Sequence, residues 1–573
     1  MCGIVGFVDL TRNPRHGGRA YVARMLERIA YRGPDQRSIG EYGSIVLGMN
    51  RLSIVDHEEH SIPYEDPMGH GALVYNGEIY NHQEIRSGLG EGIEFQTDSD
   101  AETVLYDFLK RGFKGLQEYN GMHTMAFLNR RRKELTLVRD KAGEKPLYYV
   151  KTPQFFAFAS EMKCLLDLIH PEPNITLAYR AFEFGVGRET LFKGIQQLLP
   201  GEMLTLNLEG ECRLKDYWKL WDRDLEIPDD EKRIEEDLTA LIEDAILLRT
   251  RNSVHQFAIF TGGGVDSALM ACISKPDRLY YCHYDLGAAF DELDYARLVA
   301  KKIDRELVVV EPKKEDFERT RDRIAYHLDT PCTWTSFSLW MLLESLDKDI
   351  RVIMTGEGAD EAFAGYHRYH LLHHDEQIHS LDAMKEYQYL IQKYYGSPEE
   401  RYVRLINRCD NVYDQEVMQY LHEVVRGYFE NAGGDVVHGM GMNDFYSTMQ
   451  VLLQMSDRLS MAFSIENRSP FLDHRLLEYA FRMPSSYKIR EGRTKWILKK
   501  ISRKIIPHEI ADRIDKRGFS APLNVWFGWE KLGKYNRATY RNLCFQDWCT
   551  NFGMTTGGAD VLPYMQPGLE ALG

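Results

Sequence analysis

Cysteine is the second residue of the chain, in the opening stretch MCGIVGF. If Met1 is removed, the thiol of Cys2 and a free α-amine belong to the same residue. Such an amine has a reference pKa of about 8, so part of it is neutral at pH 7 and can take the thiol proton, directly or through water. A nucleophilic N-terminal thiolate is therefore one hypothesis for Cys2, which this residue alone does not establish. The alternative is an ordinary buried cysteine in a strand.

A second chemical feature is the loop TGGGVDS, which begins at Thr261. An apolar run precedes it and a helix-like run follows, so the backbone N–H groups of three glycines converge beside a helix N-terminus and form an anion site. The loop lacks the Lys-Ser/Thr ending of a Walker A motif and does not read G-x-G-x-x-G. It ends in Asp266 and Ser267, and a carboxylate beside phosphates indicates an intervening Mg²⁺. We predict a phosphate site here, with a plain tight turn as the alternative.

The elements that must position these groups follow two patterns. In the first 210 residues, short strand-like segments such as HGALVYNGEIY and HTMAFLN alternate with turns, and helical patterns interrupt them near 19–30 and 100–112. This predicts a layered α+β domain. The segment 219–231 is charged, contains a proline and lacks apolar periodicity, which is typical of a linker.

After about residue 232, helices alternate with the strand-like runs QFAIF, LYYCHY, ELVVV and RVIMT. This alternation predicts a parallel sheet with crossover helices. Residues 376–545 are largely helical in pattern, and the last two dozen residues contain Gly and Pro and look peripheral.

Composition limits the class of protein. A chain of 573 residues is too long for one core. Its net charge of −15 argues against a general nucleic-acid binder. We expect no membrane span and no secretory signal, because no apolar run approaches about 18 residues and no basic segment precedes the first one. The nine cysteines are scattered, and the closest pair, Cys544 and Cys549, lacks the partners of a zinc site, so a reducing cytoplasm is the expected compartment.

The first half of the chain carries an ordered series of motifs. MCGIVGF is followed by YRGPD (31–35), RLSIVD (51–56), NGEIYNH (76–82), TDSDAE (97–102), RDKAGEKPLYY (139–149) and FASEMKCLL (158–166). Together these segments resemble the glutaminase domain of the class II glutamine amidotransferases, which has an N-terminal-nucleophile hydrolase fold. Tyr31 is a departure, since many relatives have histidine before RGPD.

This resemblance assigns the groups that an amide-hydrolysing site needs. Arg51 matches the cation for the glutamine carboxylate, and Asp100, with Glu78 nearby, matches the anion for its α-ammonium. Asn76 and Gly77 match the oxyanion donors, and losing one such donor lowers the rate about 10²–10³-fold. Alone, Arg51 could be a surface ion pair and Asn76–Gly77 a hairpin turn, but the combination with Cys2 favours the site. The expected glutamine-binding set is Arg51, Leu52, Ser53, Ile54, Val55, Asn76, Gly77, Glu78 and Asp100, and Cys2, Asn76 and Gly77 are the expected catalytic residues.

The second half resembles another family. The glycine loop is similar to the S-G-G-x-D-S pyrophosphate loop of the N-type ATP pyrophosphatases. TGEGADEAFAGYHRYH (355–370), MSDRLSMAFSIENRSPFLDHRLLEYA (455–480), and TKWILKK followed by DKRGFSAPLNVWF resemble further signatures of the asparagine synthetase family. The resemblance spans residues 1 to about 530.

Roles in the second site are also carried over by position. Asp266 and Asp360 match the carboxylates that hold Mg²⁺, Glu357 matches a glutamate required for the acyl-adenylate step, and Lys516 matches a lysine that neutralises phosphate charge. The expected ATP-binding set is Phe260, Gly262, Gly263, Gly264, Asp266, Ser267, His283, Thr355 and Gly356. Thr355 and Gly356 follow the C-terminal end of a strand, where adenine nucleotides bind in open α/β sheets.

The two resemblances together imply an architecture. We expect an αββα Ntn-hydrolase sandwich at 1–215, a linker at 216–232, and a tail at 546–573. Between linker and tail, at 233–545, we expect an α/β adenine nucleotide alpha hydrolase-like domain with a parallel sheet and a helical extension. The implied co-substrate is ATP with Mg²⁺, and the implied partners are small molecules without nucleic acid or membrane. The sequence does not reveal the oligomeric state; a homodimer is one possibility, since dimers are common among bacterial relatives.

The implied enzyme is a glutamine-hydrolysing carbon–nitrogen ligase. Cys2 would release ammonia from glutamine through a γ-glutamyl thioester. ATP would activate a carboxylate as an acyl-adenylate with loss of pyrophosphate, and ammonia would attack it. Ammonia is expected to cross inside the protein, because free ammonia would mostly be protonated and escape. The leading acceptor is aspartate, which gives asparagine.

Two departures keep the acceptor open. In DTPCTWTSFSLWML (329–342), bulky Trp334 stands where aspartate-using relatives have a small or acidic residue, although it and Trp340 could be ordinary core aromatics. Gly262 stands where the family usually has serine, with Thr261 just before it.

The alternatives to asparagine synthesis are amidation of a sugar acid, peptide or natural-product precursor, and a degenerate regulatory homologue. The latter is disfavoured by the intact set of site residues, and β-lactam formation is disfavoured because ring closure needs no ammonia.

Overall fold

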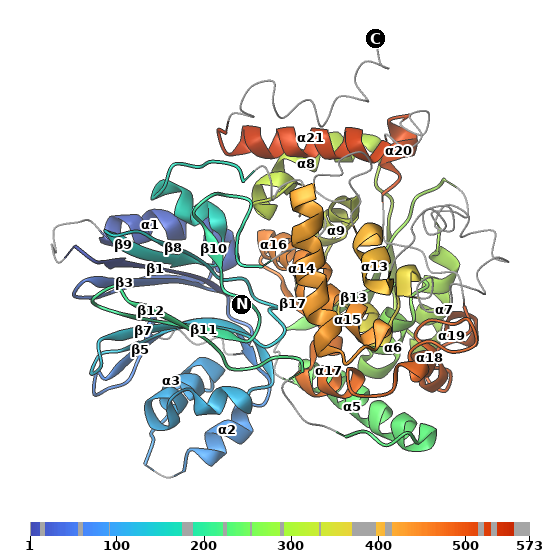
Figure 1. Cartoon of the computed structure of the whole chain (residues 1–573), viewed down its shortest axis with the longest axis horizontal. Helices are drawn as coiled ribbons and strands as arrows, with labels where there is room; N and C mark the ends of the chain where they lie inside the picture. Colours follow the sequence, from blue (N-terminus) through green and yellow to red (C-terminus); the bar gives the residue numbers. More distant parts are fainter. Residues whose placement is uncertain are drawn as a thin grey trace.

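The computed structural model describes residues 2–11, 18–55, 61–90, 92–174, 187–221, 226–251, 255–286, 291–331, 334–369, 397–406, 415–513, 521–528 and 536–554. Figure 1 shows two parts side by side, an N-terminal part in blue to teal and a C-terminal part in green to red. None of the described helices is long and apolar enough to cross a membrane.

Two six-stranded antiparallel sheets form the N-terminal part. The first has the order β10-β8-β9-β1-β3-β2 and the second the order β12-β11-β7-β6-β5-β4. The strands of the first sheet are β1 (Cys2–Asp9), β2 (Gln36–Tyr42), β3 (Ile45–Arg51), β8 (Tyr148–Lys151), β9 (Phe155–Ala159) and β10 (Gln196–Gln197). Those of the second are β4 (Tyr64–Glu65), β5 (Gly71–Ile79), β6 (Gly121–Asn129), β7 (Glu134–Arg139), β11 (Glu202–Asn207) and β12 (Cys212–Asp216).

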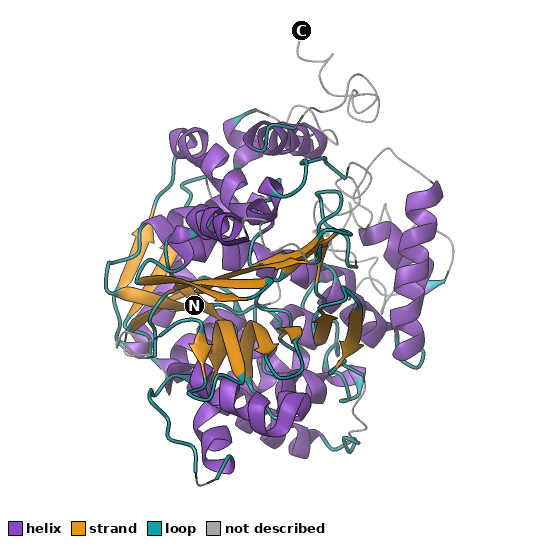
Figure 2. Cartoon of the chain, turned by 90° about the vertical axis from the view of Figure 1, so that its left-hand side faces the viewer, coloured by secondary structure: helices purple, strands orange, loops and turns teal. Residues whose placement is uncertain are grey.

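The two sheets pack face to face, and helices cover their outer faces. Strand β1 is buried along its whole length because the second sheet covers one of its faces and α1 (Gly18–Arg28) the other. The buried residues Val22, Met25 and Leu26 recur at helical spacing and turn one side of α1 to the sheet. On the other side, α3 (Asp100–Arg111) packs on β5, and α2 (His82–Gly88) packs on α3. Figure 2 shows helices above and below the strand layers, which confirms the predicted αββα sandwich.

The start of α3 is encoded locally. Ser99 caps the helix by accepting a hydrogen bond from the Ala101 N–H at 3.2 Å. Acidic residues fill the first turn and basic residues the last, as the helix dipole favours, and Gly112 at φ +64° ends the helix. This cap fixes Asp100, the first residue of the helix.

The C-terminal part contains a parallel five-stranded sheet of order β15-β14-β13-β16-β17. Its strands are β13 (Gln256–Phe260), β14 (Arg278–Cys282), β15 (Leu307–Val310), β16 (Ile350–Met354) and β17 (Glu466–Arg468). The first four confirm the runs predicted from the sequence. The fifth was not predicted, because its three residues are polar and it becomes a strand only by pairing with β16.

Helices cover both faces of this sheet. Ile259 and Leu279 pack with α5 (Glu231–Arg251) and α6 (Val265–Ser274), whereas their neighbours Ala258 and Tyr280 pack on the other face with α8 (Lys314–Leu328) and α9 (Trp334–Glu344). The remaining helices are α7 (Leu293–Ile303), α10 (Ala359–Phe363), α13 (Pro398–Ile406), α14 (Gln415–Asn431), α15 (Val436–Tyr446), α16 (Thr448–Ala462), α17 (His474–Ala480), α18 (Trp496–Ser502), α19 (His508–Ala511), α20 (Leu523–Trp526) and α21 (Asn536–Asn551). The region expected to be largely helical is so in its described part, and 376–396 lie outside it.

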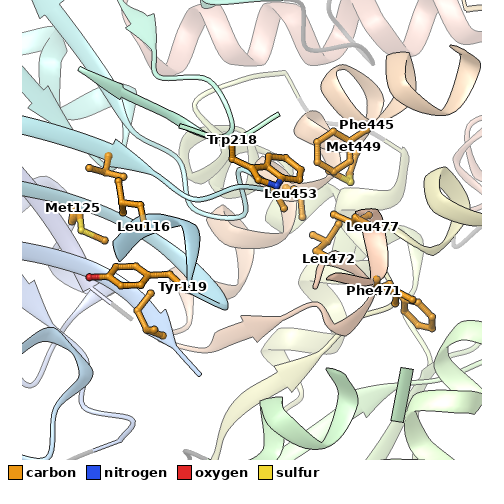
Figure 3. Close-up of a cluster of buried hydrophobic side chains, with 14 of the residues drawn as sticks. Leu116, Tyr119, Met125, Trp218, Phe445, Met449, Leu453, Phe471, Leu472 and Leu477 are labelled. Atoms are coloured by element: carbon orange, nitrogen blue, oxygen red, sulfur yellow. The ribbon is translucent and has the colours of Figure 1, made fainter. Parts of the chain in front are cut away.

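The segment between the two parts is anchored at its start. Trp218 is buried, and its Nε1 donates to Glu478 of α17 at 2.7 Å. Its ring lies 6.2 Å from that of Phe445, and Figure 3 shows it near Met449 and Leu453 of α16. Since a large aromatic residue buries much apolar area, the predicted linker begins as part of the core.

Helix α21, in red across the top of Figure 1, ties the C-terminal end of the described chain to the N-terminal part. Trp548 is fully buried, packs against Phe192 at a ring distance of 5.1 Å, and donates from Nε1 to the Asp329 carbonyl at 2.9 Å. The tail expected from 546 therefore begins inside a packed helix, and residues 555–573 lie outside the described part.

Two candidate active sites

Three strands place the N-terminal cysteine. Cys2 begins β1, and its register partner on β3 is Arg51. The backbone N of Cys2 donates to Asn76 Oδ1 on β5 at 2.8 Å. The fold thus brings together Cys2, Arg51 and Asn76, as predicted from the sequence, although they are up to 74 positions apart.

The Cys2 thiol is buried, and the groups around it shift its pKa in opposite directions. Burial raises the pKa of Cys2, while the Leu52 N–H and the charge of Arg51 act to lower it and the charge of Asp100 to raise it. A buried thiol needs such donors and cations, or its own amine, to become a thiolate. The Leu52 N–H and Arg51 thus offset part of the penalty of burial, and the pKa of Cys2 remains raised.

Gly77 follows Asn76 at a point where strands approach closely. A Cβ at this position would lie 2.1 Å from the Met122 carbonyl oxygen and 2.6 Å from the Cα of His123 on the neighbouring strand β6. Only glycine fits, because both obstacles are backbone atoms. Asn76 Nδ2 is 3.5 Å from Thr124 Oγ1, so its amide side chain is held between Cys2 and β6.

Two buried carboxylates face this site. Asp100 Oδ2 accepts from the Tyr75 hydroxyl at 2.6 Å and from the Ile79 N–H at 2.8 Å. Burial, followed by the charge of Asp100, raises the pKa of Glu78 well above its usual range. Arg468 of the other domain opposes this shift, with Nη2 3.8 Å from Glu78 Oε2. The contact was not predicted, because nothing in the local sequence near Arg468 points to the first domain.

The loop after β3 completes the first site. The Ser53 N–H donates to Asp35 Oδ2 at 2.8 Å, and the Ser53 carbonyl lies 3.1 Å from His255 Nε2. Leu52 and Ile54 are buried, while Val55 is partly exposed.

A cavity of about 580 Å³ lies at the C-terminal end of the parallel sheet. Its wall includes Thr261 and most residues predicted to bind ATP: Phe260, Gly262, Gly264, Asp266, Ser267, Thr355 and Gly356. Glu357 and Asp360 also line it, together with Tyr284, Thr335, Ser338, Leu339, Leu452 and Met455. Two residues predicted to bind ATP, Gly263 and His283, are not part of this wall. The Gly263 N–H donates to Glu292, and His283 Nδ1 is 3.2 Å from Asp291 Oδ1. Lys516 lies outside the described residues, as does the side chain of Trp334.

The two carboxylates predicted to hold Mg²⁺ meet at one ammonium group. Lys495 Nζ lies 2.5 Å from Asp266 Oδ2 and 2.7 Å from Asp360 Oδ1. The lysine is buried, and the two carboxylates raise its pKa against the effect of burial. Asp266 Oδ1 is buried without a hydrogen-bond partner among the described residues. Two acidic oxygens around one cation fit Mg²⁺, which takes its other ligands from phosphates and water.

Glu357 is held by a set of polar side chains. Its Oε2 accepts from the Thr355 hydroxyl at 2.7 Å, from Ser469 at 3.0 Å and from Asn467 at 3.3 Å, and its Oε1 accepts from Ser456. These contacts fix the carboxylate at the cavity wall. Lys495, Ser456, Asn467 and Ser469 were not assigned a role from the sequence, although each lies in or beside a motif that resembles the family.

An apolar cluster lies between the two sites. It joins Leu52 and Ile54 of the loop after β3 with Tyr80 and Met122 of the sandwich, and with Leu248, Val352 and Met461 of the other domain. Val352 belongs to β16, which leads into Thr355.

Comparison with known proteins gives the same two-part division. Residues 237–547 match the family described as Asparagine synthase, and residues 1–218 match that described as Glutamine amidotransferase domain. Asparagine synthetase [glutamine-hydrolyzing] 1 of Bacillus subtilis is 27% identical over 560 residues, covering 92% of this chain and 88% of its own length. Asparagine synthetase [glutamine-hydrolyzing] 3 of the same species is 28% identical, with 90% and 86% covered. Amidase chry2 of Gibberella zeae is 24% identical, with 96% and 93% covered.

Proposed function

Since the chain belongs to the asparagine synthase family, whose members use ATP, we propose that it transfers the amide nitrogen of glutamine to a carboxylate, with aspartate as the leading acceptor. The observation that carries this proposal is the presence in one chain of two separate clusters of the residues expected for these two reactions. The Cys2–Asn76 site suits amide hydrolysis, and the cavity lined by Asp266, Glu357 and Asp360 suits nucleotide chemistry.

The first half-reaction uses the thiol of Cys2. With Met1 removed, the amine of Cys2 takes the thiol proton, and Asn76 Oδ1 holds that amine in place. The thiolate attacks the glutamine side-chain amide and forms a γ-glutamyl thioester, and the amine returns the proton to the leaving ammonia. Water then hydrolyses the thioester, which releases glutamate and restores the thiol. The Gly77 N–H and the Asn76 amide stabilise the oxyanion, while Arg51 and Asp100 bind the carboxylate and ammonium of glutamine.

The second half-reaction uses the cavity at the sheet. The glycine loop binds the phosphates of ATP through backbone N–H groups. Mg²⁺, held by Asp266 and Asp360, would neutralise phosphate charge there. The acceptor carboxylate attacks the α-phosphate of ATP, and pyrophosphate leaves. Ammonia then attacks the acyl carbon and displaces AMP, while Glu357, fixed at the cavity wall by its hydroxyl and amide partners, takes a proton from the attacking nitrogen. Lys516 would stabilise the pyrophosphate that leaves.

Ammonia must pass from Cys2 to the cavity without protonation. The apolar cluster of Leu52, Ile54, Met122, Val352 and Met461 supports this passage, because an apolar surrounding disfavours ammonium and offers ammonia few partners.

A second acceptor class has support of its own. The part of the cavity wall away from the loop is built from hydroxyl and apolar side chains: Tyr284, Thr335, Ser338, Leu339, Leu452 and Met455. The described residues of the wall include no lysine, arginine or histidine, the side chains that would pair with the second carboxylate of aspartate. Two relatives carry the name amidase rather than asparagine synthetase. A carboxylate on a larger, less charged molecule is therefore the second candidate.

The test is amide formation and pyrophosphate release by the full chain with glutamine, ATP and Mg²⁺, across a panel of carboxylates that includes aspartate. Product with aspartate supports the first acceptor. Product only with another acid replaces it, and no pyrophosphate with any acid contradicts the ligase.

Site variants test the two-site scheme. Cys2→Ala should abolish the use of glutamine and leave synthesis from ammonium chloride, while Cys212→Ala, on an edge strand of the same domain, should behave as the wild type. Asp266→Asn should abolish synthesis and leave glutaminase activity, with exposed Asp294→Asn as its control. Loss of both activities in either site variant would contradict separate sites.

A further inference from the structure

A carboxylate of the protein itself lies at the phosphate loop. Glu292 Oε2 accepts a hydrogen bond from the Gly263 N–H at 3.0 Å. A Cβ built on Gly262 would lie 2.9 Å from the same oxygen. Backbone N–H groups of such a loop are the donors that phosphate oxygens use, so Glu292 occupies a position suited to a phosphate oxygen.

An arginine secures this carboxylate. Arg513 Nη1 lies 2.6 Å from Glu292 Oε1, and its side chain is only 6% exposed. The guanidinium stacks over the Tyr295 ring at 4.4 Å, and the Arg513 carbonyl accepts from Lys499 Nζ at 2.9 Å. A Cβ built on Gly263 would lie 1.8 Å from Arg513 Nη1, so the arginine contacts the loop itself.

A phosphate group and the Glu292 carboxylate cannot both accept a hydrogen bond from the Gly263 N–H. A carboxylate and a triphosphate compete for the same N–H group and repel each other, and the cost is large where water is scarce. An arginine already beside the loop is suited to phosphate, because its planar donors bind phosphate oxygens as they bind a carboxylate.

We propose that Glu292 and Arg513 form a latch over the phosphate loop: the phosphates of ATP displace the Glu292 carboxylate from the Gly263 N–H and take over its partner Arg513. Arg513 is thereby an additional phosphate-binding residue, and Glu292 an internal competitor that lowers the affinity for triphosphate. The inference rests on the proposed use of this cavity by ATP.

The test is calorimetric titration of the full chain with MgATP and, separately, with AMP, which lacks the β- and γ-phosphates. Glu292→Gln should lower the Kd for ATP about 3- to 10-fold, because the competing charge is gone while Arg513 remains. Arg513→Gln should raise it about 10- to 100-fold, the range for one lost charge-assisted hydrogen bond. Neither variant should change the Kd for AMP by more than about 2-fold.

Controls separate a latch from a structural ion pair. Arg503→Gln removes a comparable but exposed pair with Asp512 and should leave the Kd unchanged. If the pair were purely structural, Glu292→Gln and Arg513→Gln would both weaken ATP binding, and that result overturns the latch. Unchanged ATP binding in Arg513→Gln overturns it as well. If Arg513→Gln does not fold, the Glu292→Gln variant decides alone: a lower Kd for ATP supports the latch, and a higher or unchanged Kd overturns it. Absence of ATP binding by the wild type would contradict the proposed function and the latch together.

Discussion

Arg32 binds Asp457 across the domain interface through two hydrogen bonds, from Nη1 at 2.8 Å and from Nη2 at 3.1 Å, with both side chains buried. The same guanidinium donates from Nε to the Cys2 carbonyl at 3.1 Å. Asp457 belongs to α16, which also carries Ser456, a hydrogen-bond donor to Glu357. One arginine thus connects the strand of the nucleophile to the helix beside the second site.

Removing one partner of this pair should destabilise the protein strongly. Asp457→Ala leaves Arg32 buried with less than its full set of partners, and breaking a buried pair costs about 3–5 kcal/mol. We expect a loss of this size in the free energy of unfolding measured in urea. Arg19→Gln removes an exposed pair with Glu41 and should cost at most about 1 kcal/mol. An equal loss of unfolding free energy in the two variants would contradict the larger contribution predicted for the buried pair.

The glycine beside Asn76 offers a second test. Gly77→Ala would place a Cβ 2.1 Å from the Met122 carbonyl, and β5 and β6 would have to move apart. Since the Gly77 N–H is the expected oxyanion donor, glutaminase kcat should fall by at least about 100-fold. Synthesis from ammonium chloride should persist. The matched control is Gly88→Ala in α2, where an added Cβ meets nothing within 4 Å, and it should retain full glutaminase activity. Normal activity of Gly77→Ala would contradict the role of this N–H.

Much of the architecture was accessible from the sequence, because strands and their loops carry local patterns. Four parallel strands and the residues at their ends were predicted, and strand adjacency brings Asp266 and Asp360 to one point. Lys495 between them was not predicted. A charged residue in a loop shows no periodicity, and its direction depends on the packing of distant helices.

The interface between domains was the least predictable part. Trp218 lies in a stretch expected to be a linker, and Trp548 beyond the start of the expected tail, yet both are buried. A short aromatic segment without helical or strand periodicity carries no signal of the surface that will cover it. The contacts of Arg32 and Arg468 with the opposite domain likewise depend on how the two domains pack together.

Stability in acid should depend on Glu466. Its side chain is buried, and Arg468, bound at 2.7 Å, lowers its pKa to about 2 against the effect of burial. The unfolded value is about 4.3, so the folded state favours the carboxylate. This contribution is fully present above about pH 4.5 and is lost as pH falls towards 2, a change of about 3 kcal/mol. Urea unfolding between pH 5 and 2.5 should show the loss. Glu466→Gln should be less stable at neutral pH and should flatten that part of the profile, and an unchanged slope would contradict the assignment.

The hydroxyl missing at Gly262 has a replacement next to it. Thr261 is 3% exposed and lines the cavity, and its Oγ1 has no hydrogen-bond partner among the described residues. We therefore predict that Thr261 supplies the hydroxyl contact to phosphate. Thr261→Val keeps the shape and should raise the Kd for ATP about 10-fold while leaving that for AMP unchanged. Gly262→Ser should not improve ATP binding, because the Thr261 hydroxyl already supplies this contact to phosphate. A large gain with Gly262→Ser and no loss with Thr261→Val would mean that the loop is a weakened phosphate site.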